Sequence, residues 1–231
     1  MICAISMSFE GSDYPRDFLY SDYAVFFEKF GCTLVLIPNA VEKIEDYFDR
    51  LPVDGVILSG GNDLSSEFTG QPVVDIRNAS VLRDRQEKKI LDCAVGRKLP
   101  VLGICRGMQF INCYFGGSLT QNLSRETSED IHIAKTHAIS FCDKKAVDFF
   151  NTDHIEVNSY HHQGVHRGQV SPQLGVMAIS AKDDVVEGLF HPRLPIAAVQ
   201  WHPERKGPSF EYDSRLINAF ISAGLYWQRR E

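Results

Sequence analysis

The chain has 231 residues, of which 44% are hydrophobic and 23% charged, and no apolar run is long enough to cross a bilayer. Asp and Glu total 30 against 24 Lys and Arg, which gives a formal charge of -6 and a pI near 5.8. This balance argues against broad binding to nucleic acids or anionic membranes, because such binding needs a basic surface. We therefore expect a globular protein whose partner is a small molecule.

Short apolar runs alternate with longer segments of helical period through the first half of the chain. This pattern predicts strands over 2–7, 33–37, 53–58 and 101–104, and helices over 18–30, 41–48, 81–95 and 106–114. In the second half it predicts strands over 137–142, 155–158, 176–181, 185–190 and 196–201, then a helix over 214–223. Such alternation is typical of an α/β fold whose parallel strands are joined by helices. No linker or repeat is visible, so we expect one domain over residues 1–231.

The six cysteines indicate a reducing compartment. They lie in apolar runs and form no C-x-x-C pair, unlike the cysteines of disulfide-rich or zinc-finger chains. The N-terminal apolar segment 1–7 is short and lacks a basic leader, so it does not resemble a signal peptide. We therefore expect a cytoplasmic protein.

One cysteine stands in a special context. Residues 103–107 read G-I-C-R-G, follow a predicted strand and open a predicted helix, as in the nucleophile elbow of hydrolases. Small residues on both sides permit a tight turn that exposes the central side chain, and the helix N-terminus favours a thiolate. Cys105 is therefore the candidate nucleophile. An inert buried cysteine is the alternative, and it remains the interpretation of Cys3, Cys32, Cys93, Cys113 and Cys142.

A thiol nucleophile needs a base, and the base needs a partner that orients it. The predicted strand 196–201 leads into His202-Pro203-Glu204. Because the residue before a proline is extended, His202 and Glu204 can face the same side. Ligands gather at the carboxyl ends of parallel strands, where both the elbow and this segment lie. Cys105, His202 and Glu204 are thus predicted to form a catalytic triad.

Together these motifs resemble the class I glutamine amidotransferase superfamily. The resemblance rests on G-I-C-R-G-M-Q-F-I-N at 103–112 and Q-W-H-P-E at 200–204, supported by S-G-G-N-D at 59–63, Arg83-Asp84 with Glu87, N-S-Y-H-H-Q at 158–163 and S-R-L at 214–216. Arg106 and Met108 stand where amidotransferase subunits of synthases typically carry Leu and His. Together with the long stretch between residues 61 and 81, they favour the γ-glutamyl hydrolase branch, similar to γ-glutamyl-γ-aminobutyrate hydrolases and peptidase C26.

The resemblance implies a flavodoxin-like, mostly parallel sheet with helices on both faces and the triad named above. It also implies an oxyanion hole formed by the backbone N–H groups of Gly61 and Arg106. The implied substrate-binding residues, which hold the glutamyl group, are Gly60, Gln109, His161, His162 and Gln163.

The reaction implied is hydrolysis of a γ-glutamyl amide through a γ-glutamyl thioester, which requires no cofactor. No metal is expected, because His161 and His162 are neighbours that point opposite ways and no carboxylate is spaced to complete a site. The other histidines, His132, His137, His154, His166 and His191, are interpreted as structural or surface residues.

No motif in the sequence identifies the amine that leaves. The stretch 62–80 is expected to wall its side of the pocket, and Arg83, Arg85, Arg205 and Lys206 offer cations for an anionic amine, such as a phosphorylated or nucleotide-linked amide in a glycan pathway. Two alternatives remain open: a glutaminase subunit that supplies ammonia to a separate synthase chain, and a non-catalytic relative. The sequence predicts no oligomeric state.

Overall fold

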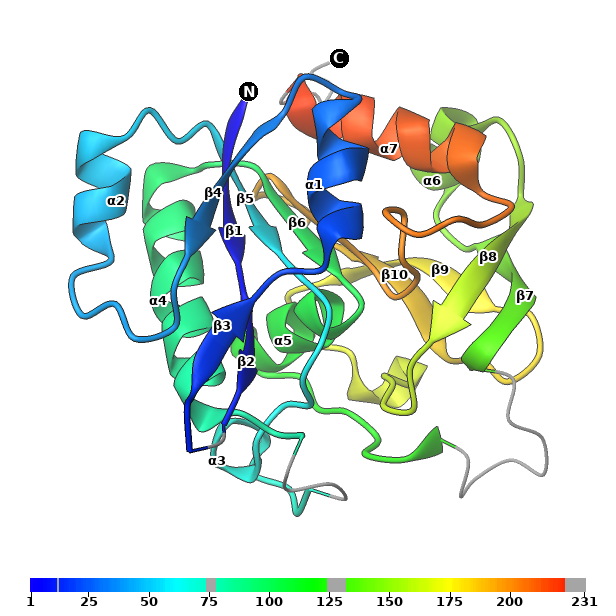
Figure 1. Ribbon diagram of the computed structural model, residues 1–231. Helices are drawn as coiled ribbons and strands as arrows, with labels where there is room; N and C mark the ends of the chain where they lie inside the picture. The colour runs from blue at the N-terminus through cyan, green and yellow to red at the C-terminus, as the bar shows by residue number, and fades with distance from the viewer. Residues whose placement is uncertain (12, 74–77, 124–131, 223–231) are drawn as a thin grey trace.

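A nine-stranded sheet forms the centre of the molecule. A computed structural model describes residues 1–11, 13–73, 78–123 and 132–222, and orders the sheet β4-β1-β5-β6-β11-β10-β9-β7-β8 (Figure 1). The strands are β1 (Ile2–Ser6), β4 (Thr33–Ile37), β5 (Gly55–Leu58), β6 (Val101–Ile104), β7 (Ile133–Phe141), β8 (His154–Tyr160), β9 (Gly175–Ser180), β10 (Val186–Phe190) and β11 (Ile196–Val199). Strands from both halves of the chain thus share one sheet. The single-domain organisation stays a prediction.

The sheet is parallel from β4 to β11 and antiparallel from β10 to β8. In the parallel part, β6 lies between β5 and β11, with Gly103 opposite both Leu58 and Ala198. The four residues of each of these three strands are buried, because helices cover both faces. Their carboxyl ends therefore emerge side by side, and this edge carries the motifs identified in the sequence.

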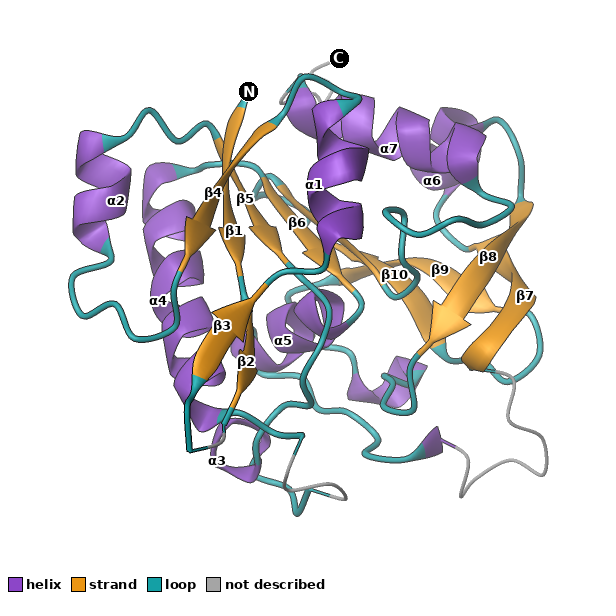
Figure 2. Cartoon of the chain, in the orientation of Figure 1, coloured by secondary structure: helices purple, strands orange, loops and turns teal. Residues whose placement is uncertain are grey.

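Helices cover the two faces of the sheet, as the α/β prediction required (Figure 2). On one face, α1 (Ser21–Glu28), α6 (Lys144–Phe150) and α7 (Phe210–Ile221) pack through aromatic and aliphatic side chains such as Phe27, Phe150 and Phe220. On the other, α2 (Glu45–Arg50), α4 (Val81–Arg97) and α5 (Arg106–Tyr114) bury residues such as Phe48 and Phe110. Successive side chains of β1 point to opposite faces of the sheet. Ile5 packs in the core beneath α1, α6 and α7, and Ala4 packs in the core beneath α2, α4 and α5.

Several elements differ from the sequence-based expectation. The helix predicted over 18–30 begins at Ser21, because residues 16–18 form β3 (Arg16–Phe18) and pair with β2 (Ser8–Glu10). The short helices α3 (Ser66–Thr69), α6 and η2 (Arg167–Gln169) were not predicted, since each is too brief to show a helical period. The last helix starts four residues earlier than expected, and residue 223 lies outside the described residues. None of the described helices is long and apolar enough to span a membrane.

Candidate active site

The turn between β6 and α5 holds Cys105 in a conformation that L-residues rarely adopt, with φ 52° and ψ -105°. Glycine is required around it, because a Cβ at Gly107 would lie 2.2 Å from the carbonyl oxygen of Leu58, and one at Gly103 would lie 2.9 Å from Gly107. The Cys105 N–H donates to the carbonyl oxygen of Val199 on β11 (2.8 Å). The elbow predicted from the glycine spacing is thus present, and it presents Cys105 at the N-terminus of α5.

His202 and Glu204 follow β11 and form the hydrogen-bonded pair that the sequence predicts. The Nδ1 of His202 lies 2.6 Å from Oε1 of Glu204, and both side chains are buried. Burial alone lowers the pKa of His202, but the negative charges of a Cys105 thiolate and of Glu204 outweigh it and raise this pKa to about 9. The three predicted residues are therefore together, in an arrangement that favours the protonated imidazole of His202.

Asn158 on β8 fixes the backbone of the histidine. Its Oδ1 accepts from the His202 N–H, and its Nδ2 donates to the His202 carbonyl oxygen, both at 2.9 Å. Asn158 opens the N-S-Y-H-H-Q segment 158–163, but no feature of the sequence predicted this role for it. The indole of Trp201 anchors the preceding position, since its Nε1 donates to Asp213 on α7 (2.8 Å). These contacts fix the backbone that carries the imidazole, through Asn158 on β8 and through Asp213 on α7.

The loop after β5 supplies the predicted oxyanion glycine. Gly61 has φ +125°, and a Cβ there would lie 2.3 Å from Ser8 Oγ. Among the described residues, the N–H groups of Gly61 and Arg106 have no hydrogen-bond partner. The Gly60 N–H differs, because it donates to the hydroxyl of Tyr23 on α1 (2.7 Å). No signal in the sequence pointed to Tyr23.

A buried ion network holds this loop. The guanidinium of Arg83 donates to the carbonyl oxygens of Ser59 (2.7 Å) and Gly60 (3.0 Å) and pairs with Glu87 (2.9 Å). The Arg106 side chain pairs with Asp84 and Glu87, so its guanidinium is buried. Only the backbone N–H of Arg106 therefore remains next to Cys105. Burial and the nearby Arg106 lower the pKa of Arg83 to about 10.

The expectation that Arg83 and Arg85 offer cations to a leaving group is wrong. Arg83 is completely buried beneath the 59–61 loop, and Arg85 pairs with Glu67 on α3 (2.7 Å). Both lie on α4, whose sequence alone does not reveal which residues face the loop. Arg205 and Lys206 are the members of that set that remain near the triad.

A cavity of about 170 Å³ opens over Cys105. Its lining includes both predicted oxyanion-hole residues, Gly61 and Arg106. It also includes four of the five residues expected to bind substrate, Gln109, His161, His162 and Gln163, together with Asn62, Asp63, Asn78 and Tyr160. Gly60 is not among these lining residues, since it lies beside the triad, where a Cβ would be 2.8 Å from Cε1 of His202. Part of the 62–80 stretch thus walls the cavity as expected, while residues 74–77 lie outside the described residues.

Hydrogen bonds connect the residues that line this cavity on the side of Gln109 and Gln163. Gln109 Nε2 donates to the carbonyl oxygen of Gln163 (3.0 Å) and to Oε1 of Gln200 (3.1 Å). His161 Nδ1 lies 2.8 Å from the same carbonyl oxygen, and His162 Nε2 lies 3.0 Å from Asp63 Oδ2. His161 and His162 therefore point different ways, as neighbours on an extended segment must.

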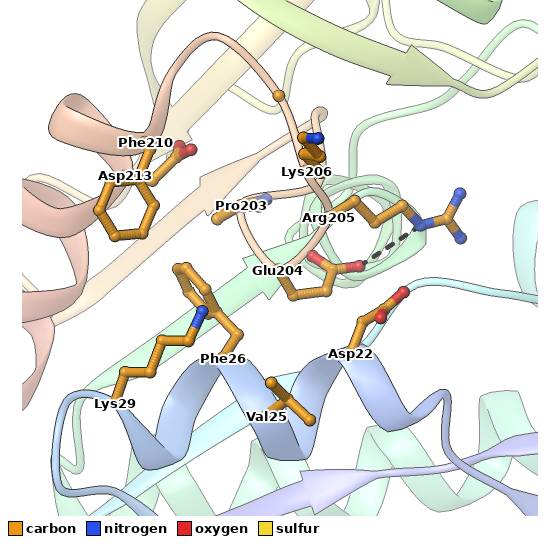
Figure 3. Close-up of a pocket in the computed structure, with 11 residues that line it drawn as sticks. Asp22, Val25, Phe26, Lys29, Pro203, Glu204, Arg205, Lys206, Phe210 and Asp213 are labelled. Atoms are coloured by element: carbon orange, nitrogen blue, oxygen red, sulfur yellow. Dashed lines mark ion pairs between the residues drawn. The ribbon is translucent and has the colours of Figure 1, made fainter.

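A larger cavity, about 400 Å³, lies behind Glu204 and does not include Cys105 in its lining. Figure 3 shows it between α1, which contributes Asp22, Val25 and Lys29, and the segment that follows the triad. Arg205 Nε lies 3.8 Å from Glu204 Oε1 there. Because this cavity lacks the nucleophile, the smaller cavity over Cys105 is the candidate reaction site.

The sequence matches the peptidase C26 family over residues 3–204. The chain belongs to the peptidase C26 family. Similar proteins include the glutamine amidotransferase-like protein YvdE of Lactococcus lactis, 33% identical over 210 residues that cover 86% of each chain. The γ-glutamyl-CDP-amidate hydrolase of Campylobacter jejuni is 31% identical over 170 residues, covering 74% of this chain and 71% of that protein.

The fold of this C26 hydrolase is that of the class I glutamine amidotransferases. The crystal structure of a GMP synthase-like protein from Thermoplasma acidophilum superposes with a TM-score of 0.67 at 21% identity, covering 96% of this chain and 95% of the other. The family match and the relatives confirm the predicted superfamily and its peptidase C26 branch, and the structural likeness confirms the α/β fold class.

Proposed function

We propose that this chain hydrolyses the γ-glutamyl amide bond of an N-substituted γ-glutamyl compound, releasing glutamate and an amine. The observation that carries the proposal is a cavity lined by Cys105, Gly61 and Arg106, next to the His202–Glu204 pair that interacts with Cys105. The N–H groups of Gly61 and Arg106 have no partner within the described part of the chain. Acyl transfer needs this combination, because a nucleophile, a proton carrier and oxyanion donors must act on the same carbonyl group.

The reaction proceeds in two halves. The Cys105 thiolate attacks the amide carbon, and the N–H groups of Gly61 and Arg106 stabilise the oxyanion. The His202 imidazolium gives its proton to the leaving nitrogen, so the C–N bond breaks and a γ-glutamyl thioester remains. Neutral His202 then takes a proton from water, which attacks the thioester, and the released sulfur returns as the thiolate. Glu204 keeps the imidazole oriented throughout.

The glutamyl end of the substrate is assigned to the cavity over Cys105. Its α-amino and α-carboxylate groups need polar partners, and the lining is mostly polar. Gln109, His161, His162 and Gln163 are the proposed binding residues, and Asp63 adds a carboxylate for the α-amino group. With a volume of about 170 Å³, the cavity suits a small amino acid moiety, so the amine must extend outward.

The leaving side is assigned to the surface beside Tyr160 and Arg205. Tyr160 lines the rim of the cavity, its ring centroid 5.9 Å from that of His202. The Arg205 guanidinium lies 4.6 Å from the Tyr160 ring and 5.8 Å from that of Tyr20. An aromatic ring beside a guanidinium suits a planar, anionic amine. We therefore propose a phosphorylated or nucleotide-linked amide, consistent with the name of the Campylobacter relative.

The test is glutamate release from a panel of γ-glutamyl amines, peptides, nucleotide-linked amides and L-glutamine. N-substituted amides should exceed L-glutamine in kcat/KM, since only they contact the leaving side in the transition state. Cys105→Ala should abolish release. If L-glutamine is the best substrate, or if activity requires an added synthase, the chain is a glutaminase subunit instead.

The anionic leaving group is tested separately. Arg205→Gln should lower kcat/KM for a nucleotide-linked amide by about 10- to 100-fold, the value of a charge-assisted contact, and leave an uncharged γ-glutamyl amine unaffected. Arg85→Gln is the matched control, because Arg85 already pairs with Glu67. An equal effect of Arg205→Gln on both substrates would contradict the charge assignment.

A further inference from the structure

Four polar side chains meet in a buried cluster behind the reaction cavity. His137 comes from β7 and Glu187 from β10, while His132 directly precedes β7 and His161 directly follows β8. All four are at most 4% exposed. Ligand atoms of His132, His137 and Glu187 lie within 4.8 Å of one another. The antiparallel part of the sheet in Figure 1 thus gathers residues that are up to 55 positions apart.

Hydrogen bonding accounts for only part of this cluster, since His132 Nε2 lies 2.7 Å from Asp183 and its Nδ1 lies 3.4 Å from Ser159 Oγ. Among the described residues, both carboxylate oxygens of Glu187, both ring nitrogens of His137 and Nε2 of His161 are buried and have no hydrogen-bond partner. Buried polar atoms are almost always paired, and an unpaired buried carboxylate is especially unfavourable. Three of these atoms, Glu187 Oε1, His137 Nε2 and His161 Nε2, lie close enough to point to a missing common partner.

The spacing of the atoms indicates what that partner is. Oε1 of Glu187 lies 3.4 Å from His137 Nε2, 3.7 Å from His161 Nε2 and 3.8 Å from His132 Nδ1. These separations are long for hydrogen bonds. Two ligand atoms that each lie about 2.0–2.1 Å from a tetrahedral zinc ion are separated by about 3.4 Å, close to the distances found here.

The outer contacts are also those of metal-binding histidines. His132 Nε2 lies 2.7 Å from Asp183 Oδ2, so its Nδ1 faces Glu187. His161 Nδ1 is held by the carbonyl oxygen of Gln163, so its Nε2 faces Glu187. A carboxylate or carbonyl partner on the second ring nitrogen is the usual support of a metal-binding imidazole.

We propose that this cluster is a zinc site in which His132, His137 and Glu187 bind the ion and His161 supplies the fourth donor. Glu187 and Asp183 together balance the two positive charges of zinc.

Such an ion would be structural. The cluster contains no member of the triad, and its donors fill a tetrahedral shell without leaving a position for substrate. It would nevertheless brace the cavity, because His161 and Gln109 bond the same carbonyl oxygen of Gln163. The inference shares one side chain, His161, with the proposed reaction, but its test measures zinc content and not glutamate release, so the two proposals can fail separately.

The experiment measures zinc in tag-free Cys105→Ala protein, because the reactive thiolate could itself bind the ion. Protein purified from zinc-supplemented medium should retain about one zinc ion per chain after dialysis, by elemental analysis. Stripping with a chelator and adding Zn²⁺ at about 100 times its dissociation constant should raise Tm by about 5–10 °C. Co²⁺ added to the stripped protein should give the strong visible bands of a four-coordinate site.

Two substitutions made in the same background complete the test. Glu187→Gln keeps the shape of the side chain but removes its charge, so zinc content should fall at least about tenfold. His154→Gln is the control, because His154 is an exposed histidine that pairs with Asp153, and zinc content should be unchanged. The proposal would be overturned if the Cys105→Ala protein contained no zinc and its Tm did not respond to Zn²⁺. Full zinc retention after the further change Glu187→Gln would also overturn it.

Discussion

Replacing Cys105 by alanine should lower the pKa of His202. This pKa is raised from 6.5 to about 9 although burial acts in the opposite direction, and the charge of Cys105 is the strongest of the opposing effects. The difference corresponds to about 3 kcal/mol of preferential stabilisation of the imidazolium. Without the thiolate, burial is opposed mainly by Glu204, so the imidazolium should lose its proton at a clearly lower pH.

The assay is a pH titration of the His202 ring nitrogens by NMR in the parent and in Cys105→Ala. Cys93→Ala serves as the control, since Cys93 lies on α4 and not in the cavity, and it should leave the titration unchanged. Circular dichroism must show that each variant remains folded. A His202 pKa near 9 in Cys105→Ala, or near 6.5 in the parent, would refute the ion-pair reasoning.

The remaining predictions concern the pH profile, the elbow and the support of the histidine. Since the pKa of His202 is raised, its acidic form persists to about pH 9 and is lost above it, so kcat/KM for an amide should fall there, while alkylation of Cys105, which needs no acid, should not. Gly107→Ala should lower the free energy of unfolding by at least about 1–3 kcal/mol in urea titrations, because its Cβ would meet the backbone of Leu58. Gly96→Ala on α4, where a Cβ meets nothing within 4 Å, should be neutral or stabilising, and equal losses would contradict the steric argument. Asn158→Ala removes two buried hydrogen bonds to the His202 backbone, so kcat should fall with a stability loss of about 1–3 kcal/mol, and unchanged kcat would exclude a positioning role.

The sequence by itself determined the elements whose signal is local. Gly103 and Gly107 flank Cys105 because the β6–α5 turn leaves no room for a Cβ, so the spacing of two glycines was enough to predict the turn. The His202-Pro203-Glu204 segment likewise carries its geometry within three residues, although the 2.6 Å contact is made across a turn closed by the Arg205 N–H on the His202 carbonyl oxygen (3.1 Å), and not along an extended backbone. Alternation of apolar runs and helical periods predicted the α/β fold for the same reason.

The tertiary structure decided what depends on contacts between distant segments. Arg83 was taken for a surface cation, but α4 packs against the 59–61 loop and buries it beneath Gly60, 23 positions away. The Gly60 N–H donates to Tyr23, whereas the Gly61 N–H has no partner among the residues that the structure describes, and no pattern around either glycine reveals this difference. The histidines read as structural meet Glu187 only because β7 and β10 flank β9 in the antiparallel part of the sheet. Strand order arises from burial summed over the whole chain, so the partners of a buried charge cannot be read from its neighbours in sequence.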